Sequence, residues 1–563
     1  MDFRIAQASF LSFCLIILTS CQQAPPSLDL KEYPLPKDVE SVSTRDVDTG
    51  GIFIRAELGE LATLNPMVAE DRSSSNAIKL MLGSLVEYNW VTEESIPGLA
   101  KSWTISEDGK TFTFSLREGL RWSDGHLFDA DDVLFSYQAY MDERFPNRGR
   151  FQLLIDGQFP KFEKIDDLTV RIISPKIYAP FLIFICGMEI MPEHILRPAF
   201  EDGTLLKAWS IGTAKNNPNM IVGTGPYLLE SYKPGERIVF VRNPNYYKVD
   251  QDGNRLPYMD RIISHIFRDV RTQTIAFSRG LTDAESIQPT DLGWVQMSSE
   301  KFDFKILERG PAPSTSFIWF NLNPGKNKDG KPFVDPKKLA WFQDVRFRRA
   351  VSYGVNRKGI IDGVLFGRGV ELVSMTSPAN KKWFNPNVRR YPYDPEKARS
   401  LLIEAGFRYD NQGKLFDTTG NRVSFKLETN KESNTRTDMA TVFKENMAEL
   451  GIEVELRFVD FNSFIVSISD SFEYEAGLLG FGGGVSDPHA GKDIYMSGGR
   501  LHQWYPEQPT PATPWEAEID KLMIEQGSTL DFTKRKAAFD RVQALIAEHV
   551  PVIPLVTPMG YVG

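Results

Sequence analysis

The chain has 563 residues, of which 42% are hydrophobic and 12% aromatic, and its formal net charge is -9. This length exceeds an ordinary domain of about 100–200 residues, so we expect three or more structural units. The composition excludes a disordered chain, and the negative charge without a basic stripe argues against binding to nucleic-acid phosphates.

The N-terminus is typical of a targeting segment. Arg4 supplies a weak positive region, and the apolar run 8–18 is shorter than the roughly 20 residues that span a bilayer. Leu18-Thr19-Ser20-Cys21 then resembles the lipobox of bacterial lipoproteins, which implies cleavage before Cys21 and acylation of its thiol. The alternative is an ordinary secretory leader in which Cys21 is coincidental. Residues 1–20 are therefore interpreted as a signal peptide, and 21–48, rich in Pro, Ser and charge, as a flexible tether.

The cysteines do not indicate a disulfide framework, because Cys14 and Cys21 lie in or at the end of the leader. Cys186 lies in an apolar run and is expected to be a small buried side chain. That run, 177–191, is the most apolar stretch after the leader, yet it is too short for a membrane helix and contains Glu189.

The folded part begins near Gly51 with a predicted strand over 52–56, followed by a loop at 71–76 and a helix over 77–85. The alternation of residues 111–117 predicts a half-buried strand. Asp129 is expected to cap a helix over 130–141, with Asp131 and Asp132 near its positive end. These aspartates could instead suggest a metal site, but neighbouring carboxylates in a first helical turn are more often caps.

A β-hairpin is predicted at 227–242. Two apolar, β-branched runs, 227–232 and 237–242, flank the turn sequence Lys-Pro-Gly-Glu at 233–236. Gly223 and Gly225 precede it and are expected to let the backbone bend.

Later elements follow the same signals. A strand is predicted at 317–323 and a helix from Asp344. Asp394 and Pro395 are expected to start a helix that Gly406 ends. Residues 450–456 indicate a helix that leads into a strand, Thr513 caps a helix that Gly527 ends, and 532–549 and 550–556 are a final helix and strand.

Several of these segments together resemble one family, the bacterial extracellular solute-binding proteins of family 5, which serve oligopeptide, dipeptide and nickel ABC importers. The resemblance rests on GTGPY at 223–227 with RNPNYY at 242–247, PGLAKSW at 97–103, WSDG at 122–125, DVRFRRA at 344–350 and YDPEKARSLLIEAGF at 393–407. One departure is Asn356-Arg357, where the family commonly has Asp-Arg.

The resemblance implies an α/β, bilobal periplasmic-binding-protein fold of type II, cluster C-like, with mixed sheets and an extra inserted domain. The expected division is lobe I at 49–85, 188–283 and 545–563, domain II at 86–187, and lobe II at 284–544. Family members usually continue past this last strand, which leaves open whether lobe I is complete at Gly563.

The resemblance also implies the function: a solute, most often a peptide, is captured between lobes that close by hinge motion, and is delivered to ABC permease subunits. The expected partners are that solute, the permease and a membrane reached through the Cys21 anchor, with no cofactor, metal or nucleic acid. The protein is expected to be monomeric and outside the cytoplasm. A lipoprotein sensor or chaperone of the same fold, or a binder of oligosaccharides or other solutes, remains an alternative.

An enzyme is the rival class. The six histidines form no H-E-x-x-H, and the chain has no G-x-S-x-G and no P-loop. Ser486, Asp487 and His489 suggest a triad, but triads join residues that are distant in sequence. The sequence therefore indicates no catalytic residues.

The ligand-site hypothesis centres on the loop 478–488. In oligopeptide binders of the family, an aspartate after a Gly-Trp pair holds the peptide α-ammonium, and the matching position here is Gly484. Phe481 keeps an aromatic side chain that can stack on a ligand. Gly482, Gly483 and Gly484 allow close backbone approach, and Asp487 lies near the end of the loop. On the first lobe, Glu70, Asp71 and Arg72 match ligand-contacting positions. Glu70 or Asp71 could hold an amine, or all three could face solvent.

Overall fold

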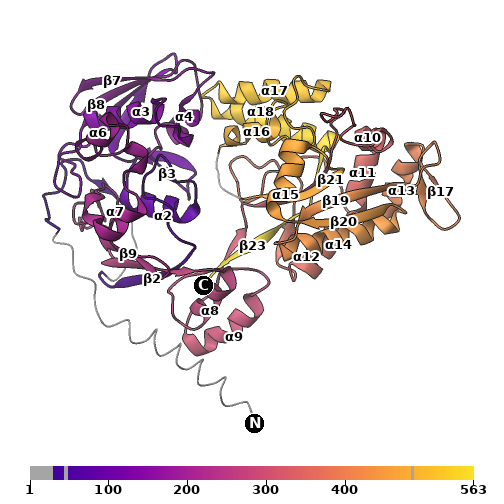
Figure 1. Cartoon of the computed structure of the whole chain (residues 1–563), viewed down its shortest axis with the longest axis horizontal. Helices are drawn as coiled ribbons and strands as arrows, with labels where there is room; N and C mark the ends of the chain where they lie inside the picture. Colours follow the sequence, from indigo (N-terminus) through magenta and orange to yellow (C-terminus); the bar gives the residue numbers. More distant parts are fainter. Residues whose placement is uncertain (1–29, 43–48, 483–486) are drawn as a thin grey trace, which may run out of the picture. The chain divides into compact units, whose positions relative to one another are not determined.

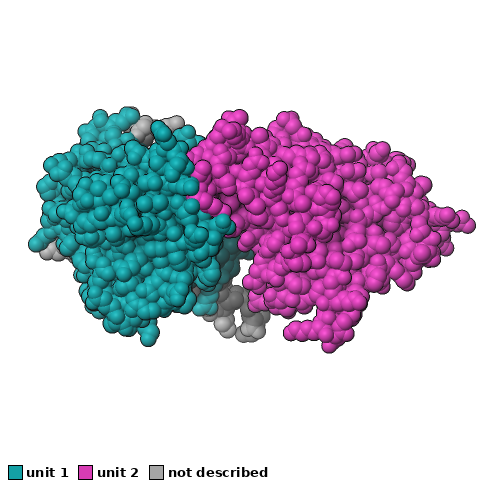
Figure 2. All heavy atoms as spheres, turned by 90° about the horizontal axis from the view of Figure 1, so that it is seen from above, with its two compact units in different colours: residues 1–175, 181–285 teal, residues 176–180, 286–563 magenta. Residues whose placement is uncertain are grey.

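The computed structural model describes residues 30–42, 49–482 and 487–563. The chain forms two compact units (Figure 2): unit 1 is Met1–Pro175 with Phe181–Glu285, and unit 2 is Lys176–Pro180 with Ser286–Gly563. Cys21, Gly483 and Gly484 lie outside the described residues. Among the helices of the described ranges, none is both long and apolar enough to cross a membrane.

Unit 1 contains two four-stranded sheets. The first has the order β2-β12-β10-β9, with β2 parallel to β12 and the other pairs antiparallel, and the second is antiparallel with the order β5-β6-β8-β7. The bounds are β2 Ile52–Leu58, β5 Ala100–Ile105, β6 Thr111–Leu116, β7 Lys161–Asp166, β8 Thr169–Ile173, β9 Tyr227–Lys233, β10 Arg237–Arg242 and β12 Arg261–Phe267. Shorter strands are β1 Glu40–Ser41, β3 Val86–Asn89, β4 Glu94–Pro97 and β11 Lys248–Val249.

The predicted hairpin is confirmed, because β9 and β10 pair antiparallel on either side of the expected turn. Gly235 in that turn has φ +73, a conformation that glycine adopts without strain. The α-helices of unit 1 are α2 Arg72–Met81, α3 Ala130–Met141, α4 Arg148–Leu153, α5 Phe181–Phe184, α6 Glu193–Glu201, α7 Ile211–Asn216 and α8 Val270–Ser278.

Helix α2 differs from its prediction at both ends. It begins five residues before the predicted residue 77 and ends at Met81 rather than at 85. The earlier start is due to Asp71, whose carboxylate accepts a hydrogen bond from the Ser74 backbone N–H at 2.7 Å. The polar run that suggested a loop is thus the capped first turn of the helix.

Gly223 and Gly225 do more than bend the chain ahead of the hairpin. They lie against the last turn of α2, where the Gly225 N–H donates to the Met81 carbonyl at 2.8 Å. A Cβ on Gly223 would lie 2.0 Å from the Met81 oxygen, and one on Gly225 would lie 2.4 Å from the Leu80 oxygen. Close backbone approach is therefore the reason for both glycines.

The three neighbouring aspartates at the start of α3 have structural partners. Asp129 caps the helix and forms a capping box with Asp132. The buried Asp132 also accepts from the Trp122 indole N–H at 2.9 Å, while Asp131 pairs with Lys164. Burial raises the pKa of Asp132 to about 6. The cap interpretation is confirmed.

Unit 2 is built on a mixed five-stranded sheet of order β20-β19-β21-β15-β22. Strands β19, β20 and β21 run parallel, whereas β15 is antiparallel to both of its neighbours. The bounds are β15 Thr315–Phe320, β19 Ser424–Asn430, β20 Glu453–Val459, β21 Ala476–Phe481 and β22 Val552–Pro554. A second sheet joins β13 Ser286–Ile287, β14 Leu307–Pro311, β16 Gly369–Glu371 and β23 Val556–Val562, and β17 Arg408–Tyr409 pairs with β18 Leu415–Phe416.

Helices cover both faces of the five-stranded sheet, with α12 and α14 on one side and α17 and α18 on the other (Figure 1). Side chains of β15 alternate between two cores, so that Ile318 and Phe320 belong to one and Phe317 and Trp319 to the other. The helices are α9 Leu292–Phe302, α10 Pro336–Gln343, α11 Val345–Gly354, α12 Arg357–Val364, α13 Pro395–Glu404, α14 Asn434–Glu449, α15 Phe461–Val466, α16 Lys492–Tyr495, α17 Pro514–Gly527 and α18 Phe532–His549.

The C-terminal strands belong to unit 2, which differs from the predicted placement of 545–563 in lobe I. The predicted single strand at 550–556 is two strands, β22 and β23. Strand β22 pairs with β15, and β23 pairs with β13, β14 and β16. Their hydrogen-bond partners all lie within unit 2, and this decides their placement.

Candidate ligand pocket

A pocket forms at one end of the unit 2 sheet, where β15 begins and β21 ends. Thr315 and Phe481 stand directly opposite each other in this antiparallel pair, so their side chains project to the same face. Phe317 shares that face, and its ring centroid lies 5.0 Å from that of Phe481. A Cβ on Gly480 would lie 2.3 Å from the Thr315 carbonyl oxygen, so this close pairing requires glycine.

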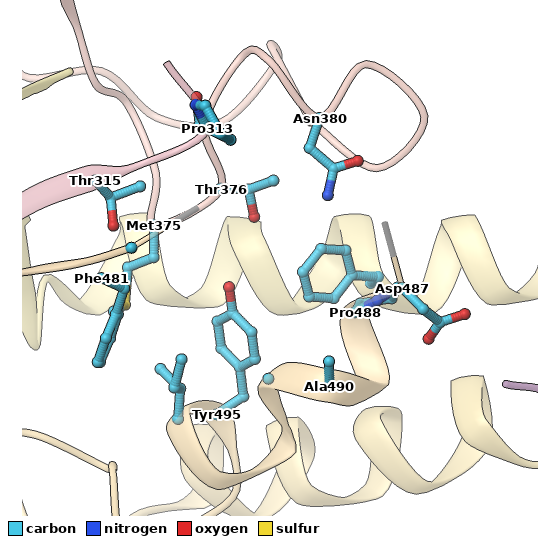
Figure 3. Close-up of a pocket in the computed structure, with 15 residues that line it drawn as sticks. Pro313, Thr315, Met375, Thr376, Asn380, Phe481, Asp487, Pro488, Ala490 and Tyr495 are labelled. Atoms are coloured by element: carbon cyan, nitrogen blue, oxygen red, sulfur yellow. The ribbon is translucent and has the colours of Figure 1, made fainter. Parts of the chain in front are cut away.

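The pocket has a volume of about 200 Å³. Besides β15 and β21, its walls come from the loop after β16, the 3-10 helix η5 (Pro488–Gly491), α16 and α18. Figure 3 shows side chains from these segments converging, among them Phe481, Thr376 and Tyr495. Phe539 of α18 also lines the pocket, which therefore lies at the edge of the core that contains Phe317.

Asp487 is held in a buried polar network rather than left free for a ligand. Its two carboxylate oxygens each accept a hydrogen bond from one guanidinium nitrogen of Arg535 at 2.8 Å, and Oδ1 also accepts the backbone N–H of His489. Gln526 connects the network, because its Oε1 accepts from Arg535 and its amide nitrogen lies 3.0 Å from Nδ1 of His489. Burial, with nearby Lys492, Arg535 and Lys176, lowers the pKa of His489 to about 4.

The structure brings together three of the predicted site residues, since Phe481, Gly482 and Asp487 all line this pocket. Gly483 and Gly484 fall outside the described residues, so the alignment of Gly484 with the family's aspartate stays a prediction.

The predicted charged trio belongs to unit 1. Glu70 and Arg72 are exposed, and Asp71 is half-buried at the start of α2. One carboxylate oxygen of Asp71 caps the helix, while the other, Oδ2, is buried and makes no hydrogen bond with any described residue. The expectation that all three face solvent thus fits Glu70 and Arg72 but not Asp71. A ligand role for the trio stays a prediction.

Several lining residues were not singled out from the sequence: Thr315, Met375, Thr376, Ser377, Asn380 and Tyr495. The polar stretch at 374–378 indicates a loop, but nothing in it shows which wall that loop completes. Phe539 is buried in α18, and it also lines the pocket.

Comparison with known proteins places these observations in a family. The family model described as bacterial extracellular solute-binding proteins, family 5 Middle, matches residues 94–502. A probable ABC transporter-binding protein of Deinococcus radiodurans is 30% identical over 539 residues, which cover 92% of this chain and 89% of that protein. The dipeptide-binding protein of Escherichia coli is 26% identical, with 87% and 86% covered.

A solved structure has a similar fold. The ABC transporter substrate-binding protein CtaP of Listeria monocytogenes superposes with a TM-score of 0.73 at 25% identity, with 92% of this chain and 94% of that chain covered. The family match spans more than half of the chain, and the motifs at 97–103, 122–125, 223–227, 344–350 and 393–407 fall inside it. The chain therefore belongs to the bacterial extracellular solute-binding proteins of family 5.

Proposed function

We propose that this protein is the peptide-capturing component of an ABC importer and hands its ligand to membrane permease subunits. The observation that carries the proposal is the pocket at the end of β15 and β21, whose lining includes Phe481, Gly482 and Asp487 from the loop 478–488. Family membership supplies the solute-binding role.

A peptide is the ligand class we favour. Relatives named for dipeptide binding, heme binding and nickel binding are each 25–26% identical, so identity alone does not choose between their ligands. The described pocket residues favour an organic group, because aromatic and aliphatic side chains form much of the lining and the Asp487 carboxylate is already engaged. Oligosaccharide remains the second candidate, because aromatic side chains can also stack on sugar rings.

We further propose that the protein is a monomeric lipoprotein outside the cytoplasm, tethered through Cys21. Support comes from the residues 18–21. Membrane fractionation and intact mass of the wild type against Cys21→Ala test this. We expect a lipid-modified, membrane-associated wild type and a soluble variant, and an unmodified, soluble wild type would end the proposal.

Binding without chemistry is the expected mode of action. Calorimetry with peptides such as Ala-Tyr-Ala should show saturable binding, and mass spectrometry should recover the peptide unaltered. X-ray scattering should show a smaller radius of gyration when ligand is bound, as hinge closure requires. Recovery of hydrolysed peptide would favour an enzyme instead.

The role in import is a separate question from binding. A sensor of the same fold would bind the same ligand, so uptake has to be measured. We expect cells that lack the protein to lose accumulation of labelled Ala-Tyr-Ala, and genes for an ABC permease to lie beside its own. Normal uptake together with a lost transcriptional response to peptide would establish the sensor.

A further inference from the structure

The size of the unit 2 pocket sets what can enter it. Its volume of about 200 Å³ is below the range of roughly 300–1,000 Å³ that encloses a whole drug-sized ligand. An apolar cavity of about 150 Å³ is known to hold one benzene molecule. The pocket therefore has room for one substituted ring or one side chain, and the rest of a ligand has to lie outside it.

The walls favour a ring. Phe481, Tyr495 and Phe539 come from three different elements and all contribute to the lining, together with Met375 and Ile494. Aromatic side chains pack well against another ring in offset or edge-on geometry. Methionine adapts its shape to whatever group is present.

Thr315 adds a hydrogen-bonding group that the fold does not use. The residue is only 5% exposed, and its Oγ1 is buried without a hydrogen-bond partner among the described residues. Figure 3 shows this hydroxyl directed toward the ring of Phe481. A buried hydroxyl with no partner is costly, so a ligand atom that pairs with it gains stability that the empty protein lacks.

The other hydroxyl-bearing side chains of the lining have partners. Ser377 donates to the Ala312 carbonyl and accepts from the Ala379 N–H, and Tyr495 shares a side-chain hydrogen bond with Thr376. Thr315 is thus the lining hydroxyl through which a ligand can be recognised.

The charges of the pocket lining disfavour ionised ligand groups. Of the lining residues that the structure describes, Asp487 alone carries a charge, and its buried ion pair with Arg535 already balances it. A ligand cation would find no unpaired carboxylate there, and a ligand anion would find no basic side chain. Burying either charge without a partner is unfavourable.

We propose that this pocket is a side-chain subsite for a neutral aromatic ring that bears a hydroxyl group, read by Oγ1 of Thr315. For a peptide ligand, this makes tyrosine the preferred residue at one position, ahead of phenylalanine and well ahead of lysine or aspartate. The preference rests on the proposed peptide-binding function, whereas the ring subsite itself can be tested without a peptide.

The direct test uses three small probes with the full chain: 4-methylphenol, toluene and benzylamine. Ligand-observed NMR should show 4-methylphenol binding about fivefold more tightly than toluene, the effect of one neutral hydrogen bond, and benzylamine binding more weakly than both. Thr315→Val should remove the difference between the first two, and Thr315→Ser should restore it. Thr441→Val, the same change on the exposed face of α14, should leave all three affinities unchanged.

Three results would each overturn the proposed subsite. They are equal binding of 4-methylphenol and toluene to the wild type, an unchanged preference for 4-methylphenol in Thr315→Val, and benzylamine binding as tight as that of 4-methylphenol. Thermal unfolding of the three variants checks that they are folded, because a Thr to Val change conserves shape.

A peptide series separates this inference from the proposed function. Calorimetry would use tripeptides of alanine with Tyr, Phe, Lys or Asp placed at each position in turn. A tyrosine preference at one position that Thr315→Val abolishes supports both ideas. Peptides that bind without any tyrosine preference overturn the subsite alone. If no peptide binds while 4-methylphenol does, peptide capture fails and the ring subsite stands.

Discussion

Asp487 and Arg535 form a buried ion pair in which one guanidinium nitrogen lies 2.8 Å from both carboxylate oxygens. The pair ties the loop after β21 to helix α18, and the same arginine donates from Nε to the carbonyl of Gln526 at the end of α17. The carboxylate that the sequence offers as a ligand contact is therefore part of the scaffold that shapes the pocket.

The first prediction concerns this pair. Asp487→Asn should lower the free energy of unfolding of unit 2 by about 3–5 kcal/mol, because it leaves the Arg535 charge buried without its partner. Asp470→Asn is the matched control, since Asp470 pairs with Arg500 on the surface, and it should cost less than about 1 kcal/mol. Denaturant unfolding measures both.

In the double variant Asp487→Asn/Arg535→Met, the loss of stability should be smaller than the sum of the losses of the single changes. A stable Asp487→Asn variant that loses ligand would show instead that Asp487 is an anchor.

The second prediction is a pH dependence from His489. Its folded-state pKa is lowered to about 4, below the ordinary value of 6.5, so the unfolded chain binds the proton more readily. Stability is then fully present above about pH 6.5 and falls as the pH drops toward 4, by at most about 1.4 kcal/mol per pH unit from this group.

The comparison with His489→Gln isolates this contribution, because glutamine can still accept from Gln526 but does not titrate. Unfolding curves of the two proteins at pH 7, 6, 5 and 4 should diverge only below about pH 6.5. Parallel curves over that range would show that His489 does not titrate as its burial implies.

The third prediction concerns the glycine entry to the hairpin. Gly225→Ala should destabilise unit 1 by about 1–3 kcal/mol or more, since the new Cβ would lie 2.4 Å from the Leu80 carbonyl oxygen and the backbone must shift. Gly293→Ala in α9 is the control, because nothing lies within 4 Å of its Cβ position. That change should be neutral or stabilise by up to about 1 kcal/mol, the helix propensity difference. Equal effects of the two variants in thermal unfolding would contradict the close-approach explanation.

The fourth prediction concerns the ligand's amine. The described residues that line the unit 2 pocket offer no carboxylate free of a partner, and the sequence resemblance predicts that Gly484 takes the place of the aspartate of oligopeptide binders. N-acetylation of Ala-Tyr-Ala should therefore change its affinity less than about threefold in calorimetry. A loss of about 3 kcal/mol or more, as breaking a buried charge pair costs, would reveal an amine anchor. Asp71, whose buried Oδ2 has no hydrogen-bond partner among the described residues, would then be the first residue to substitute by asparagine.

Local signals in the sequence were strong enough to place several helices and the hairpin. Asp129, Asp344, Asp394 and Thr513 each cap the helix predicted to start there, because a cap depends only on a side chain and the backbone a few residues away. Asn356, which stands where the family commonly has aspartate, is explained in the same way. Its amide oxygen accepts the Gly359 N–H at 2.8 Å, so asparagine caps α12 as aspartate would.

Local sequence signals do not explain the environment of the adjoining Arg357. It is buried and donates to the carbonyls of Pro554, Ser352 and Tyr391, and Arg348 likewise donates to the carbonyls of Phe342, His549 and Val550. Burial lowers the pKa of Arg357 to about 10, which still leaves it charged at neutral pH. The sequence alone does not indicate their burial, because each arginine also donates to a backbone carbonyl about 200 residues away, that of His549 for Arg348 and that of Pro554 for Arg357.

By itself, then, the sequence determined the family, the class of function, and those elements whose ends depend on neighbouring residues. Only the tertiary structure decided which contacts the candidate site residues make. It paired Asp487 with Arg535, set Thr315 opposite Phe481, brought Phe539 to the same pocket, and gave the C-terminal strands to unit 2. The physical reason is that caps and turns are satisfied locally, whereas pairing of a buried charge and closure of a pocket wall depend on partners that the fold brings from distant parts of the chain.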